Sequence, residues 1–223
     1  MKNTETMLRD IETEIRYTRD LIGKDAFDPR VMTAMAEVPR HEFVPDLERT
    51  CAYANGPLPI GHGQTISQPY IVALMTDLLG CGPDARVLEV GTGSGYQAAV
   101  LSRVVDRVYS IEIVPELAGD AAARLARLGY DNVETRLGDG YNGWAEEAPF
   151  DGILVTAAAP AVPAPLVEQL REGARLVIPV GVPYGHQELK VVEKEADGSV
   201  TTSRVLGVAF VPLTRTTSSA DSG

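Results

Sequence analysis

Three glycines on alternate positions constrain the fold of this chain more than any other feature of its sequence. Gly91, Gly93 and Gly95 end a short apolar stretch at residues 86–90, and a helix-like stretch begins at Gln97. Glycine lets the backbone turn sharply and lets a ligand approach without a side chain in the way. The following helix directs its free N–H groups toward that ligand. The pattern is typical of a nucleotide-cofactor loop at the carboxyl end of a parallel strand.

The spacing of these glycines also narrows the choice of cofactor. The dinucleotide fingerprint is G-x-G-x-x-G, which packs a pyrophosphate against a helix start, whereas this chain has G-x-G-x-G without the lysine of a P-loop. Such a loop favours a ligand without phosphates, and S-adenosylmethionine is one. In the next β-rich stretch, residues 107–113, Glu112 follows the loop by about 20 residues, where a ribose-binding carboxylate is expected. Alternatively, Glu112 is a solvated charge and the glycines only form a tight turn.

The charge balance narrows the classes of partner. Acidic residues outnumber basic ones by 31 to 20, which gives a formal net charge of −11. This balance argues against binding to nucleic acid, which needs a basic face, and against binding to an anionic membrane surface. No apolar stretch approaches the ~20 residues that span a bilayer. We therefore expect neither a nucleic-acid partner nor a membrane partner.

The amino-terminal residues and the two cysteines indicate the cellular compartment of the protein. The first residues carry mixed charges rather than an apolar core, so we expect no secretory signal. The spacing of Cys51 and Cys81 does not demand a disulfide, and both are expected to be small buried hydrophobes rather than catalytic thiols. The sequence therefore indicates a reduced, cytoplasmic protein, and we expect it to act as a monomer.

Length and periodicity predict the architecture. A chain of 223 residues is long enough for one substantial core and short for two. Strand-like stretches at 86–90, 107–113, 132–137, 151–156 and 174–180 alternate with helix-like stretches at 96–105, 115–128 and 163–171. This alternation predicts an α/β fold with a doubly wound, mostly parallel sheet. Short strands at 188–194, 200–205 and 208–212, with an Asp-Gly turn at 197–198, predict an antiparallel carboxy-terminal edge.

The residues before this core predict helices and a loop. Leu8, Ile11, Ile15 and Ile22 fall near one helical face, and further helices are expected at 28–37 and from Gln68-Pro69 through Leu79. Residues 38–45 are interrupted by prolines, and residues 54–67 are expected to form a long structured loop. We expect a single domain over residues 1–223, made of amino-terminal helices and a substrate loop (1–80), a cofactor-binding core (81–214) and a disordered polar tail (215–223).

Several segments together resemble one known family. They are 38–44 (VPRHEFV), 59–70 (PIGHGQTISQPY), 87–97 (VLEVGTGSGYQ), 138–140 (GDG), 148–151 (APFD), 156–160 (TAAAP), 176–181 (LVIPVG) and 211–213 (VPL). On these segments the chain resembles the protein-L-isoaspartate O-methyltransferases, a class I S-adenosylmethionine-dependent family with a Rossmann-like fold, extra amino-terminal helices and a reversed late strand. The glycine loop is common to all class I methyltransferases, whereas GQTISQP is far more specific. The first forty residues extend further than a short family member needs, which leaves the position of the first helix open.

The resemblance implies an activity and a set of roles. The enzyme would transfer a methyl group from S-adenosylmethionine to the free α-carboxylate of L-isoaspartyl residues in damaged proteins and peptides, and would release S-adenosylhomocysteine. Ser67 would be the active-site serine, with Gln64, Thr65 and Ile66 lining the cleft beside it. The remaining implied roles fall to Gly91, Thr92 and Gly93 under the methionine part of the cofactor, Glu112 on the ribose, Gly138 and Asp139 beside the adenine, and Thr214 in the carboxy-terminal active-site segment.

The chemistry of this transfer explains why Ser67 is a suitable residue. A carboxylate with a pKa near 4 is already ionised at neutral pH, so no general base is needed. The hydroxyl of Ser67 can donate to one carboxylate oxygen, and the predicted helix start beside it would attract an anion. Capping of that helix is an alternative reason for a serine there. Thr65 is a second hydroxyl candidate or an ordinary loop residue, and His62 is either a substrate contact or a surface histidine.

Other functions stay open at this stage. A related carboxylate methyltransferase that modifies aspartate in a dedicated peptide precursor would have the same motifs. A nucleic-acid or small-molecule methyltransferase is disfavoured, because the chain lacks both the (Asp/Asn)-Pro-Pro-aromatic segment and a Pro-Cys nucleophile. A binding module that kept only the cofactor loop is the third alternative. The histidines are far apart, and no metal-ligand spacing is present.

Overall fold

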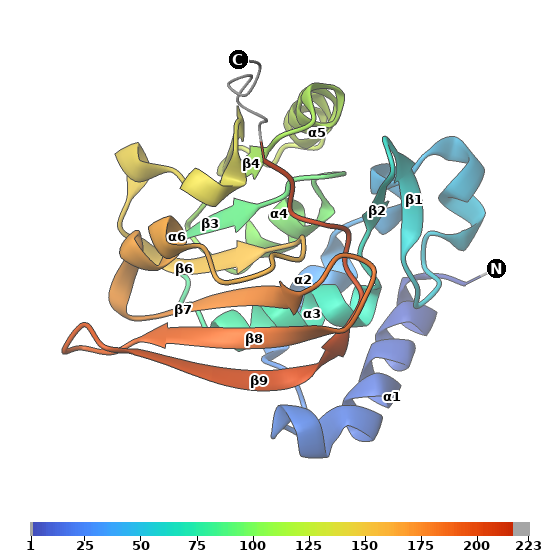
Figure 1. Cartoon of the computed structure of the whole chain (residues 1–223). Coiled ribbons are helices and arrows are strands. Elements are labelled where there is room, and N and C mark those ends of the chain that lie inside the picture. Colours follow the sequence, from blue (N-terminus) through green and yellow to red (C-terminus); the bar gives the residue numbers. More distant parts are fainter. Residues whose placement is uncertain (1, 216–223) are drawn as a thin grey trace.

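A computed structural model describes residues 2–215, and a twisted sheet forms its centre (Figure 1). The strands of this sheet are β3 (Arg86–Val90), β4 (Arg107–Glu112), β5 (Val133–Leu137), β6 (Phe150–Val155), β7 (Leu170–Gly181), β8 (Gln187–Lys194) and β9 (Val200–Val208). Their order is β5-β4-β3-β6-β7-β8-β9. Strands β3 to β7 pair in parallel, and β8 and β9 add an antiparallel edge. The doubly wound, mostly parallel sheet predicted from the sequence is confirmed.

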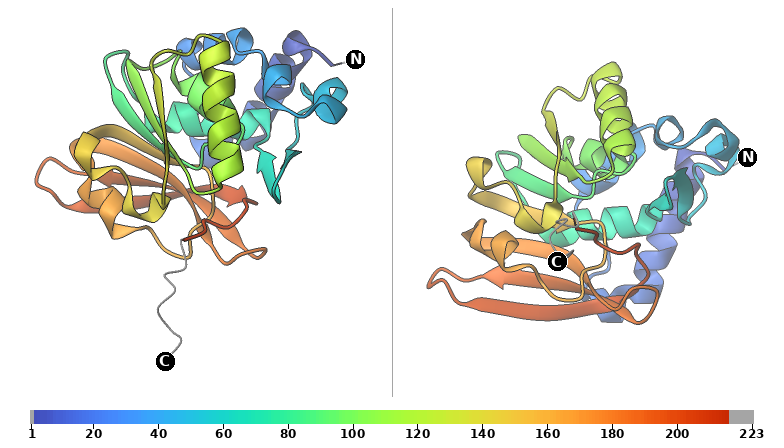
Figure 2. Two further views of the ribbon diagram at one scale, coloured as in Figure 1. Left: turned by 90° about the horizontal axis from the view of Figure 1, so that it is seen from above. Right: turned by 45° about the horizontal axis from the view of Figure 1, so that its top comes forward.

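The central strands are buried on both faces, because their apolar side chains point alternately to two clusters. The helices that follow the amino-terminal part are α3 (Pro69–Leu79), α4 (Tyr96–Leu101), α5 (Pro115–Arg127) and α6 (Ala164–Glu168). Val87 and Val108 belong to the cluster that contains residues of α3 and α4. Leu88 and Tyr109 belong to the other cluster, with Leu166 of α6. The sheet is therefore the middle of three layers, as the two views of Figure 2 show.

The amino-terminal part consists of α1 (Thr4–Ile22), α2 (Pro29–Glu37) and the 3₁₀ turns η1 (Arg40–Phe43) and η2 (Asp46–Cys51). The predicted apolar face of α1 is confirmed, since Ile11, Ile15 and Ile22 are buried. This helix packs against α2, α3 and the edge strand β9, which settles the position that the sequence left open (Figure 1). Among residues 2–215, no helix combines the length and the apolar character needed to cross a bilayer.

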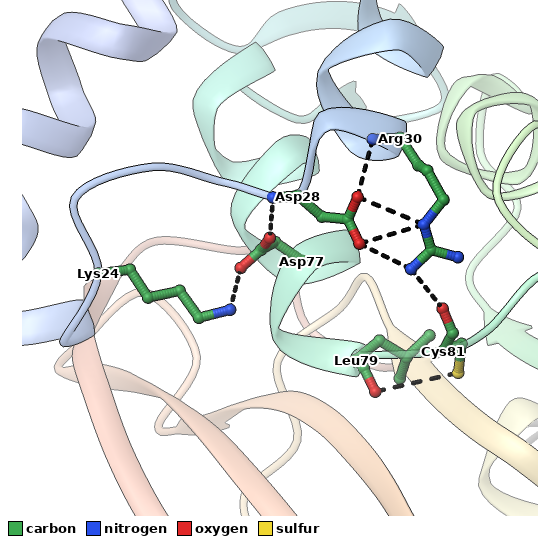
Figure 3. A network of polar contacts seen from close by, with 6 residues as sticks. All are labelled: Lys24, Asp28, Arg30, Asp77, Leu79 and Cys81. Atoms are coloured by element: carbon green, nitrogen blue, oxygen red, sulfur yellow. Dashed lines mark hydrogen bonds and ion pairs between the residues drawn. The ribbon is translucent and has the colours of Figure 1, made fainter.

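A polar network fixes these helices to the core (Figure 3). Asp77 of α3, almost fully buried, pairs with Lys24 and accepts the backbone N–H of Asp28 at 2.7 Å. Asp28 in turn caps α2 by accepting the N–H of Arg30 at 2.8 Å, as the sequence predicted, and Arg30 reaches the carbonyl of Cys81. Burial raises the pKa of the Cys81 thiol to about 12, so this thiol stays neutral and acts as a small core residue. The hydrogen bonds and ion pairs of this polar network hold α2 beside α3.

The structure corrects the sequence predictions in five places. Cys51 is exposed rather than buried. The helix expected at 96–105 ends at Leu101, where the Ser102 hydroxyl donates to the Ala99 carbonyl and competes with the helix. The helix expected at 163–171 spans only Ala164–Glu168, because β7 already begins at Leu170. The predicted loop 54–67 contains an antiparallel hairpin, β1 (Leu58–Gly61) and β2 (Gln64–Ile66).

The fifth correction concerns the carboxy-terminal edge. The strand expected at 200–205 extends to Val208 as β9, and the strand expected at 208–212 does not form: the chain after Val208 is irregular and makes a bridge between Pro212 and Ala158. A register shift, with two residues of β9 opposite one residue of β8 between Glu188 and Lys190, keeps β9 paired with β8 as far as Val208. The predicted tail at 215–223 lies outside the described residues from 216 onward.

Candidate active site

A cavity lies at the carboxyl edge of the sheet, beside the point where the strand order changes direction between β3 and β6. Such switch points are where ligands bind in doubly wound sheets. Val90, Ile111 and Thr156 line this cavity from the ends of β3, β4 and β6. The segment after β9, dark red in Figure 1, returns across this edge, and its residues 211–214 also line the cavity. We name it the cofactor cavity.

The glycine loop forms the floor of the cofactor cavity. Gly91 has a φ of 97°, and its N–H donates to the Ile111 carbonyl at 2.8 Å. A Cβ atom at this position would lie 2.3 Å from Oγ1 of Thr156, whose hydroxyl donates to the Gly91 carbonyl at 2.6 Å. Both the backbone conformation and the close approach of β6 therefore require glycine. Gly93 also has a positive φ, of 53°.

Glu112 ends β4 with its carboxylate turned back to the loop. One oxygen accepts the N–H of Gly93 at 2.7 Å, and the other accepts the N–H groups of Ile113 and Val114 at 2.9 and 3.0 Å. The residue is 6% exposed, so the alternative interpretation of a solvated charge is wrong. The carboxylate fixes the loop, and its remaining lone pairs can accept from ligand hydroxyls.

A buried carboxyl group supports the loop from below. Glu89 of β3 is fully buried, and burial raises its pKa to about 8. The Ser110 hydroxyl donates to one Glu89 oxygen and lies 2.6 Å from the hydroxyl of Thr92. The second Glu89 oxygen is buried, and within the described part of the chain it has no hydrogen-bond partner. This chain of polar groups connects the core of the sheet to the glycine loop.

Ser67 lies between β2 and α3, where the cofactor cavity meets a second cavity. The α3 helix begins at Pro69 with Gln68 as its N-cap, and no side chain caps it. Helix capping, the alternative reason for a serine, is therefore wrong. Ser67, Thr65 and Thr156 line both cavities. These residues mark the junction between the two cavities.

The second cavity, which we name the acceptor cavity, has a volume of about 480 Å³. It is lined by Ile71, Phe210 and His186 as well as the junction residues. This volume lies within the range of pockets that bind small molecules, roughly 300–1,000 Å³. The acceptor cavity thus has room for a peptide segment beside the cofactor cavity.

Comparisons with known proteins decide the family. A profile of the protein-L-isoaspartate(D-aspartate) O-methyltransferase family matches residues 18–218. The chain belongs to this family. A relative from Syntrophobacter fumaroxidans, protein-L-isoaspartate O-methyltransferase 2, is 64% identical over 93% of this chain and 84% of its own length. A relative of the same name from Nitrosococcus oceani is 62% identical over 96% of this chain and 97% of its own length.

Solved structures agree with this assignment of the family. A protein-L-isoaspartate O-methyltransferase structure superposes with a TM-score of 0.82 at 29% identity, over 94% of this chain and 65% of that chain. A Plasmodium falciparum structure in complex with S-adenosyl-L-homocysteine gives a TM-score of 0.78 at 27% identity, over 96% of this chain and 100% of that chain. The family resemblance inferred from the sequence motifs is confirmed.

The fold brings most of the residues that the family resemblance implied into the cofactor cavity. These are Gln64, Thr65, Ile66, Ser67, Gly91, Thr92, Gly93, Glu112 and Thr214. Gly138 and Asp139 do not line it, although Gly140 does, and the Asp139 carboxylate accepts the N–H of Tyr141. His62 is exposed in the turn between β1 and β2, outside both cavities, which favours the interpretation as a surface histidine. Among residues 2–215, no group of three His, Cys, Asp or Glu side chains is placed to hold a metal ion.

Reasoning from the sequence missed three members of this methyltransferase site. Thr156 follows β6 directly, so the rule that ligands bind at the carboxyl ends of strands could have found it. Tyr96 begins α4 and lines the cofactor cavity, but its sequence neighbours suggested only an ordinary helix start. Arg40, whose Nη2 donates to the carbonyl of Ser67, stands in the family segment 38–44, but the motif did not assign it to the site. In contrast to these residues, Trp144 takes no part in either cavity. It packs edge-on against Tyr109 in the core.

Proposed function

We infer that this protein is an enzyme that transfers a methyl group from S-adenosylmethionine to the free α-carboxylate of L-isoaspartyl residues in damaged proteins and peptides. Its family and the names of its relatives support this reaction. The structural observation that carries the inference is Ser67 at the junction of the cofactor cavity and the acceptor cavity. The methyl ester carries a better leaving group than the free carboxylate, so the neighbouring backbone amide nitrogen attacks the ester carbonyl, releases methanol and closes a succinimide that can reopen to normal aspartate.

The cofactor cavity suits S-adenosylmethionine in its shape and charge. Among the described residues, no lysine or arginine lines it, which fits a cationic ligand without phosphates. When bound, the cofactor supplies an electrophilic methyl group and leaves as S-adenosylhomocysteine. Gly91, Thr92 and Gly93 lie under its methionine part, and Glu112 accepts from its ribose hydroxyls. Gly138 and Asp139 are assigned to the adenine side.

The acceptor side positions an anion that is already nucleophilic. The α-carboxylate is ionised at neutral pH, so the site needs no general base. Ser67 donates its hydroxyl to one carboxylate oxygen and leaves the other free to attack. The first turn of α3 adds the positive end of its helix dipole. Gln64 and Ile66 shape the cleft, and Thr65 and Thr214 are further contacts for the substrate.

We further propose that the enzyme acts as a cytoplasmic monomer with neither nucleic acid nor membrane as a partner. The net charge of −11 opposes binding to polyanions. Both cysteines, Cys51 and Cys81, are free thiols, which agrees with a reducing compartment. Light scattering and cell fractionation would test these two points directly.

The decisive assay compares two peptides that differ only at one linkage. An isoaspartyl peptide and its aspartyl twin are incubated with methyl-labelled cofactor, and base-labile label is counted. We expect label in the isoaspartyl peptide alone. Equal labelling of both peptides, or of neither, would refute the assignment.

A further inference from the structure

Arg40 is a fully buried arginine without an acidic partner. Its side chain is 0% exposed, and within residues 2–215 no ion pair of this residue is found. The ionisable groups that act on its pKa are the phenols of Tyr96 and Tyr53, and burial lowers that pKa. A buried charge that lacks a counter-charge destabilises a fold, and apolar replacements of similar volume are often tolerated. Packing alone therefore does not explain why an arginine occupies this buried position.

The contacts of Arg40 connect three separate segments of the chain, two of which line the cofactor cavity. Its Nε donates to the Ala52 carbonyl at 2.8 Å, and its Nη2 donates to the Ser67 carbonyl at 2.7 Å. Its Cζ lies 4.7 Å from the ring centroid of Tyr96, the first residue of α4 and a lining residue of the cofactor cavity. Its Nη1 is buried and has no hydrogen-bond partner among residues 2–215. One side chain thus holds the backbone of Ser67 against the helix that follows the glycine loop.

The charge of Arg40 is positive, and the residues that line the two cavities supply no such charge for an anionic substrate. The acceptor is a carboxylate, yet among the described residues neither cavity is lined by a lysine or an arginine. His186 lines the acceptor cavity, but its side chain is largely exposed. In a site of low dielectric, an unpaired cation behind Ser67 acts over several ångströms.

We propose that Arg40 is a positioning residue of the acceptor site, which fixes Ser67 through its carbonyl and attracts the acceptor carboxylate through its unpaired charge. The proposal rests on the proposed function, because it takes the acceptor to be an α-carboxylate. The two roles have different kinetic signatures. Attraction stabilises the bound anion and lowers KM, whereas the alignment of Ser67 acts on kcat.

The test compares Arg40→Met, Arg40→Lys and the matched control Arg124→Met. Arg124 also donates to a backbone carbonyl, that of Ser94 in the glycine loop, at 2.8 Å. Three quantities are measured: kcat and KM for the isoaspartyl peptide, the Kd of S-adenosylhomocysteine, and the binding preference for that peptide over its α-carboxamide analogue. The preference is measured by calorimetry with S-adenosylhomocysteine bound, so that no turnover occurs.

We expect Arg40→Met to lose about tenfold or more of the preference for carboxylate over carboxamide, as for a lost charged contact, and to lower kcat with little change in the Kd of S-adenosylhomocysteine. Arg40→Lys should keep the preference and still lower kcat, because an ammonium lacks the fork that reaches two carbonyls. Arg124→Met should weaken cofactor binding and leave the preference unchanged.

Two results would overturn the role of Arg40. One is a Met variant with the wild-type preference and kcat. The other is a parallel loss of cofactor and peptide binding in both Arg40 variants, which indicates a merely structural role. If the Met variant does not fold, an unchanged kcat in Arg40→Lys overturns the proposal. A failure of the proposed function would instead appear in the wild-type enzyme, as absent methylation of the isoaspartyl peptide.

Discussion

The two sides of the active site are built in different ways. The floor of the cofactor side is nearly contiguous: β3, the glycine loop and β4 supply it within residues 86–114, its polar groups bond one another, and remote segments such as 211–214 add only to the walls. The acceptor side is assembled from remote segments, with Ser67 next to a hairpin, His186 between β7 and β8, and Arg40 in an amino-terminal turn. The cofactor side is thus specified by local backbone geometry, and the acceptor side by long-range packing.

The largest effect is expected from a methyl group placed on the cofactor side. In Gly91→Ala the new Cβ would lie 2.3 Å from Oγ1 of Thr156, at a φ of 97°. Strain and overpacking of this kind should weaken binding of S-adenosylhomocysteine by roughly a hundredfold or more. Calorimetric titration measures this loss.

Gly119→Ala is the matched control for this substitution. Gly119 lies inside α5, and a Cβ there would meet nothing within 4 Å. The control should bind the cofactor normally and gain about 0.5–1 kcal/mol of stability from better helix propensity. If Gly91→Ala bound as tightly as the control, local backbone geometry would not specify the cofactor side.

A smaller effect is expected on the acceptor side. Ser67→Ala removes the hydroxyl at the junction of the two cavities and leaves the carbonyl that Arg40 holds. Loss of a hydrogen bond to a charged group should lower kcat/KM for an isoaspartyl peptide by roughly 10- to 100-fold. Binding of S-adenosylhomocysteine should stay close to that of the wild type. A loss of cofactor affinity as large as the loss of kcat/KM would show that the two sides are not separable.

A third substitution returns to the cofactor side with a milder change. Glu112→Gln keeps the shape but provides one carbonyl oxygen where the carboxylate offers two to Gly93, Ile113 and Val114. We expect cofactor affinity to fall by about tenfold, while kcat at saturating cofactor changes less. Glu116→Gln, at an exposed position in the first turn of α5, is the control. Equal affinities of the two variants would remove Glu112 from cofactor binding.

The same contrast explains how far the sequence alone could predict the structure. Local sequence patterns predict the parallel strands, the glycine loop and the helix cap at Asp28, and the structure confirms all three. The predicted boundaries of α4 and β9 were wrong. A hydrogen bond of the Ser102 side chain ends α4 early, and a register shift between β8 and β9 extends β9 beyond its predicted end.

Within the site, sequence reasoning found residues that have a local signature. Glu112 was placed by its distance from the loop, and Ser67 by a family motif rather than by spacing, which favoured a helix cap. Arg40 stands in a family segment, but its contact could not be predicted, because that contact is with a backbone carbonyl 27 residues away in the chain. Such contacts exist only after the fold has brought the segments together.

The smallest effect on methyl transfer is expected from a substitution of Glu89, the buried carboxyl group below the glycine loop. The pKa of Glu89 is raised from 4.5 to about 8 by burial. Between these pH values the folded protein holds one more proton than the unfolded chain, so this group makes stability fall as pH rises. The slope is at most about 1.4 kcal/mol per pH unit, and it ends above the folded-state pKa.

Glu89→Gln removes this titration and keeps an acceptor for the Ser110 hydroxyl. Urea unfolding at pH 5 to 9 should therefore show the wild type losing stability relative to the variant up to about pH 8, with little change in turnover at pH 7. Ser110→Ala sharpens the test. Its hydroxyl lowers the Glu89 pKa, so removing it should extend the decline to higher pH. Parallel pH curves for wild type and Glu89→Gln would mean that the carboxyl is already ionised in the fold, and that the loop rests on a buried charge.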